Sequence, residues 1–250
     1  MDIKESVVLA SGLGTRISDL TKGKPKFLLR IEDIPIILYP IRIINAIGIN
    51  KINVIVPKGW AKALSEILST LNIRTCIVEN EHINRENGYS LLLARECISS
   101  REFLLSMCDH IYEPKLVKRI ISSFKTKVHI MVGGDSNPLF IDREEATKIL
   151  TDKELNVLDI GKGIKQYNYI DVGVFVMSRE VFDIAEELEK KQYSITLSEV
   201  VKNTKNKGLN VKVSDVTGCL WTEVDTVDDY LELTRGKRRI VLEKVLSYIK

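Results

Sequence analysis

The chain of 250 residues has few cysteines, few aromatic residues and little net positive charge, the features typical of zinc proteins and nucleic-acid-binding proteins. It contains only four cysteines, with no C-x-x-C pair and no nearby histidine at metal-ligand spacing, which excludes a zinc site of the usual pattern. Aromatic residues make up 6% of the chain and the net charge is only +3, so few bases could stack and few phosphates could be neutralised. We expect no nucleic-acid partner and reduced cysteines that serve in packing. The cysteines are Cys76, Cys97, Cys108 and Cys219.

Long apolar runs are absent as well. No run approaches the roughly 18 apolar residues that a membrane-spanning helix needs, and residues 1–5 are too polar to begin a secretory signal. We therefore expect a cytoplasmic protein without a transmembrane span. The densest positive run after the first loop, at 235–239, precedes apolar residues at helical spacing in 240–250. This pattern predicts an amphipathic helix packed on the domain, with contact to a membrane surface or a neighbouring domain as the alternative.

Apolar strand patterns alternate with helical patterns over the first 134 residues. The predicted strands are 5–10, 51–57, 73–80, 102–109 and 127–134. The predicted helices are 37–49, 60–71, 87–97 and one that begins at Glu113 or Pro114. Because strands that alternate with helices form parallel sheets through right-handed crossovers, the pattern predicts an α/β fold with a doubly wound, mostly parallel sheet.

The pattern changes after Gly134. Residues 135–163 consist of short apolar pieces between turn residues, which predicts a small antiparallel part that faces the substrate. The chain then returns to a buried strand at 169–178, helices in 179–191 and 196–204, and a strand at 209–216. No repeat or low-complexity linker interrupts it. We expect one domain, 1–250, made of a nucleotide-binding layer (1–134), a substrate-facing part (135–235) and a C-terminal helix (236–250).

The loop at 10–29, ASGLGTRISDLTKGKPKFLL, leaves the first predicted strand at the end where open sheets bind ligands. Neither standard nucleotide-binding motif fits it. A G-x-G-x-x-G fingerprint fails because its third glycine position is Ile17, and a P-loop fails because Gly23-Lys24 is followed by Pro25.

Two glycines and two cations remain as the useful features of this loop. Gly12 and Gly14 leave the backbone free to adopt positive φ and to expose N–H groups to phosphate oxygens. Arg16 suits bidentate contact with phosphate, while Lys26 offers a compact point charge. The loop is therefore predicted to bind phosphate, and a glycine turn with solvated lysines is the alternative.

GLGTR followed by PKFLL resembles the signature loop of the sugar-phosphate nucleotidyltransferases, G-x-G-T/S-R and then P-K. One departure is Ser11, where the family usually has alanine. The resemblance implies a Rossmann-like nucleotidyltransferase fold, a bound triphosphate, and catalytic roles for Arg16 and Lys26. It also implies nucleotide contacts at Ala10, Ser11, Gly12, Gly14, Thr15, Arg16 and Lys26.

Two further segments extend the resemblance. MCDH resembles the strand-end aspartate of the family, and WTEVDTVDDY resembles its late W-x-D-V-D-T segment. The resemblance implies that Asp109 and Asp225 hold Mg²⁺, a hard cation that prefers carboxylate oxygens. Glu223 and Asp228 are the nearby alternatives.

ENGYSLLLA is, without the family, a turn and a helix start capped by Asn87. The resemblance instead places the nucleotide base against this segment. Base contacts are then expected at Asn87, Gly88 and Ser90, with Glu79 at the end of the preceding strand. The choice between pyrimidine and purine stays open.

FIDREEATKIL and DIGKGIKQYNYIDVGVFVMS resemble segments of the CTP:inositol-1-phosphate cytidylyltransferases. This implies that the part at 135–235 binds the acceptor, with Thr147 and a catalytic Lys148 at its phosphate and Asp171 and Gly173 at its ring hydroxyls. Without the family, EEATK is an exposed strand with alternating charges. The implied substrates are CTP and inositol 1-phosphate, and the product, CDP-inositol, belongs to phospholipid biosynthesis.

Several alternatives stay open at this point. The chain could use another nucleotide or a hexose 1-phosphate, or it could be a nucleotide-binding regulator without turnover. In some relatives this domain is fused to a membrane-embedded enzyme that uses CDP-inositol. The chain could therefore be a stand-alone enzyme or one half of a fusion, could associate with a membrane-embedded partner enzyme or domain, and could form a homodimer.

Overall fold

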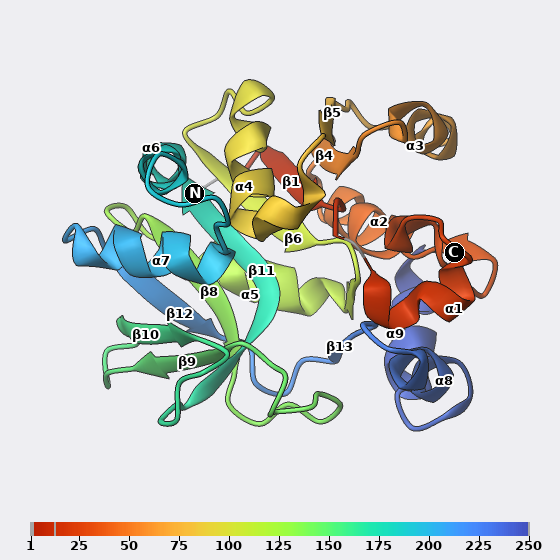
Figure 1. The fold of residues 1–250 in the computed structure, drawn as a ribbon. Helices are drawn as coiled ribbons and strands as arrows, with labels where there is room; N and C mark the ends of the chain where they lie inside the picture. The colour runs from red at the N-terminus through yellow and green to blue at the C-terminus, as the bar shows by residue number, and fades with distance from the viewer. Residues whose placement is uncertain (1–2, 13, 250) are drawn as a thin grey trace.

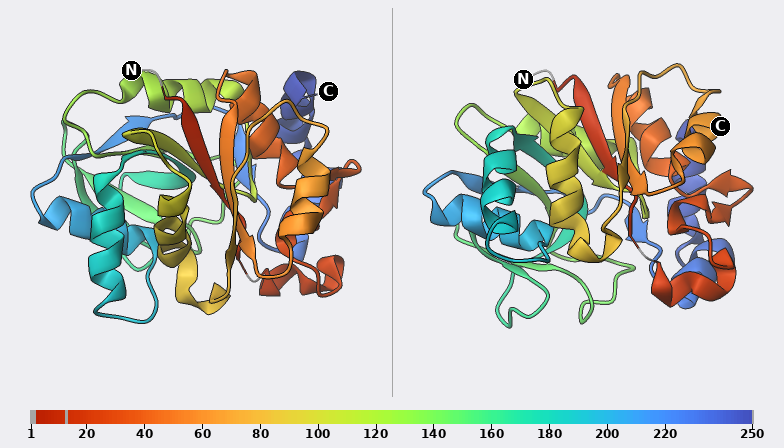
Figure 2. Two further views of the ribbon diagram at one scale, coloured as in Figure 1. Left: turned by 90° about the horizontal axis from the view of Figure 1, so that it is seen from above. Right: turned by 45° about the horizontal axis from the view of Figure 1, so that its top comes forward.

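The computed structural model describes residues 3–12 and 14–249. Met1, Asp2, Leu13 and Lys250 lie outside the described residues, so part of the segment 1–5 and one position of the G-L-G-T-R motif are not covered. A nine-stranded mixed sheet runs through the centre of the described chain, with helices on both faces (Figures 1 and 2).

One half of this sheet is parallel, as the alternating pattern predicts. The central strand β1 (Glu5–Leu9) pairs in parallel with β4 and with β6, and β4 pairs in parallel with β5. These neighbours are β4 (Lys51–Pro57), β5 (Ile77–Asn80) and β6 (Glu102–Met107). Their carboxyl ends therefore meet at one edge of the sheet, at the start of the loop that carries the glycines.

The other half mixes directions around β11 (Tyr169–Ser178), which runs antiparallel to β6, β8 and β9. The remaining strands are β8 (Ile130–Asp135), β12 (Val211–Asp215), β9 (Lys148–Thr151) and β10 (Val157–Gly161). β12 is parallel to β8, and β9 and β10 form an antiparallel hairpin. The expected antiparallel part is thus this hairpin, joined to the main sheet through β11.

Successive side chains along each strand point to opposite faces of the sheet, and both faces are buried under helices. On β1, Val7 and Leu9 pack under α4, α6 and α7, whereas Val8 packs under α2, α5 and α9. Figure 2 shows α4, α6 and α7 side by side on their face. The helices are α2 (Leu38–Ala46), α3 (Ala61–Leu68), α4 (Glu86–Leu93), α5 (Pro114–Ser123), α6 (Glu180–Glu189), α7 (Leu197–Asn206) and α9 (Arg239–Ile249). The amphipathic C-terminal helix is confirmed, since α9 buries Val241, Leu242, Val245 and Leu246.

Several elements are not among those that the sequence analysis predicts. They are α1 (Ser18–Thr21), α8 (Val227–Arg235), the hairpin β2 (Arg30–Ile31) and β3 (Ile34–Pro35), and the pair β7 (His110–Tyr112) and β13 (Trp221–Glu223). In the β7–β13 pair, His110 lies opposite Glu223. This pairing brings Asp109, just before β7, close to Asp225, just after β13, although 116 positions separate them in the sequence.

The prediction that all four cysteines are reduced is wrong for two of them. Cys76 and Cys97 form a disulfide, with their Cα atoms 5.9 Å apart. Cys76 lies just before β5 and Cys97 follows α4, and their separation of 21 residues matches no disulfide or metal motif, so only the fold brings them together. Cys108 and Cys219 are free and buried, as predicted.

No helix within 3–12 and 14–249 is both long and apolar enough to cross a membrane.

Candidate active site

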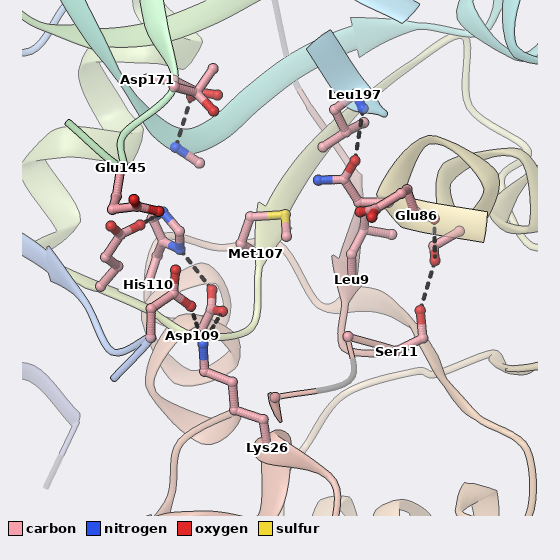
Figure 3. A pocket seen from close by; sticks show the side chains of 18 of the residues that line it. Leu9, Ser11, Lys26, Glu86, Met107, Asp109, His110, Glu145, Asp171 and Leu197 are labelled. Atoms are coloured by element: carbon pink, nitrogen blue, oxygen red, sulfur yellow. Dashed lines mark hydrogen bonds and ion pairs between the residues drawn. The ribbon is translucent and has the colours of Figure 1, made fainter. Parts of the chain in front are cut away.

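A cavity of about 590 Å³ opens at the carboxyl ends of β1 and β6, where Leu9 and Met107 form part of its wall. Figure 3 shows three groups of side chains around Met107. Lys26 and Asp109 lie at one end, Asp171 and Glu145 on one side, and Ser11, Glu86 and Leu197 on the other. The position agrees with the general rule for open α/β sheets.

The glycine loop forms one rim of the cavity. Gly14 has φ +59°, and a Cβ on it would lie 2.9 Å from the Cβ of Lys26, so a larger residue there would push the lysine away. Gly12 also lines the cavity but does not use the positive φ that the sequence left open to it. Thr15 and Arg16 follow on the same rim.

Lys26 connects the two aspartates that the sequence predicts as metal ligands. Its Nζ donates to Oδ2 of Asp109 at 2.6 Å and also to Oδ1 of Asp225. Arg16 adds a second cation, since its Nη2 donates to Oδ2 of Asp225 at 2.9 Å and its Nη1 lies 3.5 Å from Glu145. Four predicted site residues therefore meet at one point: Arg16, Lys26, Asp109 and Asp225.

Opposite charges dominate the electrostatics of this cluster. Burial opposes the charge on Lys26, but Asp109 and Asp225 outweigh it and raise the pKa of the ammonium above its ordinary value. Burial alone would raise the pKa of Asp109, yet Lys26 and His110 hold it well below its usual range. The lysine is therefore charged and the Asp109 carboxylate ionised at neutral pH.

His110 is a site residue that the sequence reasoning missed. Its Nδ1 lies 2.8 Å from Oδ1 of Asp109, and its Nε2 lies 3.4 Å from Glu223. Burial opposes protonation, but these two carboxylates raise the pKa of His110 to about 9, so both ring nitrogens carry protons at neutral pH. His110 thereby holds one oxygen of Asp109 while Lys26 holds the other. Its position directly after Asp109 in MCDH was the signal available.

Three of the four residues predicted at the acceptor line one side of the cavity: Thr147, Asp171 and Gly173. Oδ1 of Asp171 accepts the N–H of Gly173 at 2.9 Å, and burial raises the pKa of Asp171 to about 7. Gly173 has φ +68°, and a Cβ on it would lie 2.6 Å from the His110 ring. Thr147 lines the wall beside them.

Lys148 does not line the cavity. Its Nζ donates to the carbonyl oxygens of Glu144 and Lys162, each at 3.0 Å. Lys162, from the DIGKG segment, does line the wall, although the sequence analysis predicts no role for it. Because β9 and β10 form a hairpin, these two lysines are close in space while their side chains have different surroundings.

Ser11, Ser90 and Asn87, which are predicted at the nucleotide, line another side of the cavity. The hydroxyls of Ser11 and Ser90 lie 2.7 Å apart. The idea that Asn87 caps its own helix is wrong, because α4 begins at Glu86 and Asn87 lies within it. Oδ1 of Asn87 instead accepts the N–H of Leu197, the first residue of α7, at 2.7 Å.

Three residues predicted at the nucleotide do not line the cavity. Glu79 accepts the N–H of Ala61 at the start of α3, at 2.8 Å. Gly88 packs against the strand-like segment before α7, where a Cβ would lie 2.7 Å from the carbonyl oxygen of Ile195. Ala10 is buried, and its N–H donates to the carbonyl oxygen of Ile55. Each has a role in packing or capping that a local sequence pattern cannot distinguish from ligand contact.

The chain matches the family model described as nucleotidyl transferase over residues 5–239. It is 32% identical over 227 residues to a protein named bifunctional IPC transferase and DIPP synthase from Aquifex aeolicus, covering 91% of the chain and 50% of that protein. A protein of the same name from Thermococcus kodakarensis is 34% identical, with 95% of the chain and 51% of that protein covered. The chain thus spans about half the length of these curated relatives.

A solved structure of the inositol-1-phosphate CTP transferase from T. maritima has the same fold, with a TM-score of 0.91 and 30% identity. The match covers 99% of this chain and 98% of that one. The family match spans nearly the whole sheet and includes the glycine loop, Lys26 and both aspartates. This chain therefore belongs to the nucleotidyl transferase family.

Proposed function

We propose that the chain transfers a cytidylyl group from CTP to inositol 1-phosphate, giving CDP-inositol and pyrophosphate. The observation that carries the proposal is the convergence of Lys26, Arg16, Asp109 and Asp225 at one end of a cavity with two further sides. The names of the relatives, and of the solved structure that matches over its full length, support the choice of substrates.

The reaction needs no nucleophile from the protein. A phosphate oxygen of inositol 1-phosphate attacks the α-phosphorus of CTP and forms a new P–O bond. The bond from the α-phosphorus to the bridging α,β-oxygen breaks, and pyrophosphate leaves with that electron pair. The acceptor phosphate is an anion at neutral pH, so the work left to the protein is alignment and stabilisation of charge.

Lys26 and Arg16 are placed to stabilise the charge that develops on the α-phosphate and the leaving pyrophosphate. Asp225 binds both side chains, which keeps the two positive charges together at one end of the cavity. Asp171 and Thr147 line the side left for the inositol ring. Because burial raises the pKa of Asp171, this carboxyl can accept or donate a hydrogen bond to a hydroxyl near neutral pH.

The residues around Lys26 fit a divalent cation. Asp109 and Asp225 both bind one ammonium, so a positive charge is already stabilised between their carboxylates. The described residues hold no group of three metal-ligating side chains. Mg²⁺ suits such a place, because it binds through one or two carboxylates together with substrate phosphates. When bound, Mg²⁺ would offset charge on the α-phosphate and pyrophosphate.

We expect Asp109→Asn and Asp225→Asn each to raise the Mg²⁺ concentration required for half-maximal activity by roughly tenfold or more, because the amide removes the charge that favours the cation. Mn²⁺ binding in the presence of CTP, followed by electron paramagnetic resonance, should weaken in the same variants. Asp228→Asn is the matched control, since Asp228 lies in the first turn of α8 and does not line the cavity. Titrations of both variants that overlay those of the parent protein would place the metal elsewhere.

Pyrophosphate release tests the whole proposal. The four common nucleoside triphosphates are each paired with inositol 1-phosphate and with several hexose 1-phosphates. We expect CTP with inositol 1-phosphate to give the highest kcat/KM. Turnover of a hexose 1-phosphate without turnover of inositol 1-phosphate would overturn the acceptor, and no release with any pair would favour a regulator that only binds nucleotide.

A further inference from the structure

Two sides of the cavity are lined by different chemical groups. This difference indicates which side suits a nucleotide base and which suits a phosphorylated acceptor. The side formed by Ser11, Asn87 and Leu197 presents hydroxyl, amide and apolar groups, and its one acidic side chain is Glu86. The other side includes Lys162, a residue type suited to a phosphate, next to Lys148, which pairs with Ile170 beside Asp171. Figure 3 shows Glu86 and Leu197 together, across the cavity from Asp171. The nucleotide base therefore belongs on the Glu86 side.

Glu86 has an unusual backbone. Its φ is +66° and its ψ is −179°, a conformation that glycine adopts freely and other residues rarely adopt. Glu86 is the first residue of α4, and its side chain is exposed and lines the cavity. A glycine would fit this backbone without strain. The chain instead has a carboxylate here, which indicates that the side chain has a function in the cavity.

Asn87 is oriented by the protein itself. Because its Oδ1 accepts the N–H of Leu197 at 2.7 Å, the amide oxygen is fixed at the start of α7 and the Nδ2 donor is left for another partner. Asn87 lines the cavity next to Glu86. The protein thus offers a carboxylate acceptor and an amide donor side by side.

We propose that Glu86 and Asn87 select cytosine over uracil; this inference rests on the proposed function. Cytosine has an exocyclic amino donor next to a ring-nitrogen acceptor, which complements a carboxylate acceptor next to an amide donor. Uracil has the reverse pattern, a carbonyl oxygen next to a ring N–H. It would place its oxygen against the Glu86 carboxylate and its N–H against the Asn87 amide. Selectivity then comes from attraction to one base and repulsion of the other.

The test is the ratio of CTP affinity to UTP affinity, measured calorimetrically with Mg²⁺ and no acceptor. Glu86→Gln keeps the shape but replaces a pure acceptor by a group that can also donate, so we expect the CTP preference to fall by about 10- to 100-fold. Glu81→Gln is the matched control. Glu81 pairs with Lys58 on the surface and does not line the cavity, so the ratio should stay that of the parent protein.

Thermal unfolding gives a second measurement. If Glu86 had only a structural role, its replacement would lower the Tm. Glu86→Gly should lose the CTP preference while its Tm stays at or above that of the parent protein, because glycine relieves the strained backbone. Glu66→Gly, in the middle of α3, is the control, and there we expect a Tm lower by roughly 2–4 °C.

A CTP/UTP ratio within about twofold of the parent value in both Glu86 variants would overturn the inference. So would a parent protein that binds UTP as tightly as CTP. If the parent binds CTP selectively and loses that selectivity in Glu86→Gln, but releases no pyrophosphate with inositol 1-phosphate, the base selection stands and the proposed acceptor fails.

Discussion

Lys26 binds the two carboxylates, Asp109 and Asp225, that we propose as ligands of a divalent cation. Its ammonium binds Asp109 and Asp225 from a buried position, 6% exposed. If the proposed assignment holds, the two carboxylates exchange the ammonium for the cation when the substrates bind, and the lysine turns to phosphate oxygens. In this proposal Lys26 serves first as the counter-ion of the two carboxylates and then as a charge stabiliser for the phosphates.

We expect Lys26→Ala to lower turnover by roughly two to three orders of magnitude, as does loss of other preorganised charge-stabilising donors. The same variant should bind Mn²⁺ more tightly than the parent protein when no nucleotide is present, because no ammonium competes for Asp109 and Asp225. Both are measured on protein whose thermal unfolding remains cooperative. Turnover within about twofold of the parent would remove Lys26 from catalysis.

Asp171 gives a prediction about pH. Burial raises its pKa to about 7, above the value in the unfolded chain, so the folded state binds the proton more tightly. Its contribution to stability is therefore present at low pH and is lost as the pH rises through about 4 to 7. The Asp171→Asn variant has no carboxyl to ionise at this position, so it does not lose stability there as the pH rises. Since Asp171 is half-buried, we expect the variant to be more stable than the parent by on the order of 2 kcal/mol at pH 8 and equal to it near pH 4.

Urea unfolding at the two pH values measures this difference. The same variant should raise the apparent KM for the acceptor, because a carboxyl that can both accept and donate is replaced. Equal unfolding free energies at pH 8 would show that the carboxyl is solvated in the folded protein. An unchanged KM for the acceptor would show that Asp171 does not contact the acceptor.

At the scale of elements, the hairpin of β9 and β10 decides which lysine reaches the cavity. Lys148 lies opposite Gly161 in the hairpin register, and its ammonium binds the carbonyl oxygen of Lys162. The contact fixes the backbone of Lys162, which lines the cavity wall. The assignment of Lys148 to the acceptor phosphate stays a prediction, and the hairpin favours Lys162 for that contact.

We expect Lys162→Ala to lower kcat/KM for the acceptor by about one to two decades while leaving the CTP constant nearly unchanged, because it removes a charge-assisted contact with phosphate. Lys148→Ala should have a smaller effect, since it acts only through the position of the Lys162 backbone. Steady-state kinetics with each substrate varied in turn separates the two. A larger loss in Lys148→Ala than in Lys162→Ala would restore the assignment made from EEATK.

For the whole molecule, one covalent link joins distant parts of the parallel half of the sheet. The Cys76–Cys97 disulfide connects the segment before β5 with the segment after α4. The cavity lies at the other end of these elements, so the link affects the scaffold and not the chemistry. Closing a loop of this size constrains the unfolded chain.

We expect Cys76→Ser with Cys97→Ser to destabilise the protein by roughly 3 kcal/mol, or roughly 6–12 °C in Tm, for a closed loop of about this length. Thermal unfolding with and without a reductant measures it. The parent protein should lose a similar amount on reduction, and the double variant should not respond. A parent Tm that reductant leaves unchanged would argue against the link.

The sequence by itself determined the order of the main strands and helices, but not of the short elements, and it determined the position of the charged loop. The apolar patterns of the strands and helices are local signals, because each lies within a short stretch of sequence. The same holds for the loop that carries the glycines, Arg16 and Lys26. Local signals also identified Asp109 and Asp225 through the family resemblance. They could not separate residues that line the cavity from neighbours such as Gly88, Glu79 or Lys148, whose side chains or backbone have other partners.

Only the tertiary structure decided which groups meet. The β7–β13 pair brings Asp109 close to Asp225, the β9–β10 hairpin places Lys162 at the cavity wall, and the disulfide closes between segments with no shared motif. The backbone of Glu86 and the orientation of the Asn87 amide depend on contacts between α4 and α7. These features depend on long-range pairing and on steric fit between side chains, which periodicity and spacing along one chain do not encode.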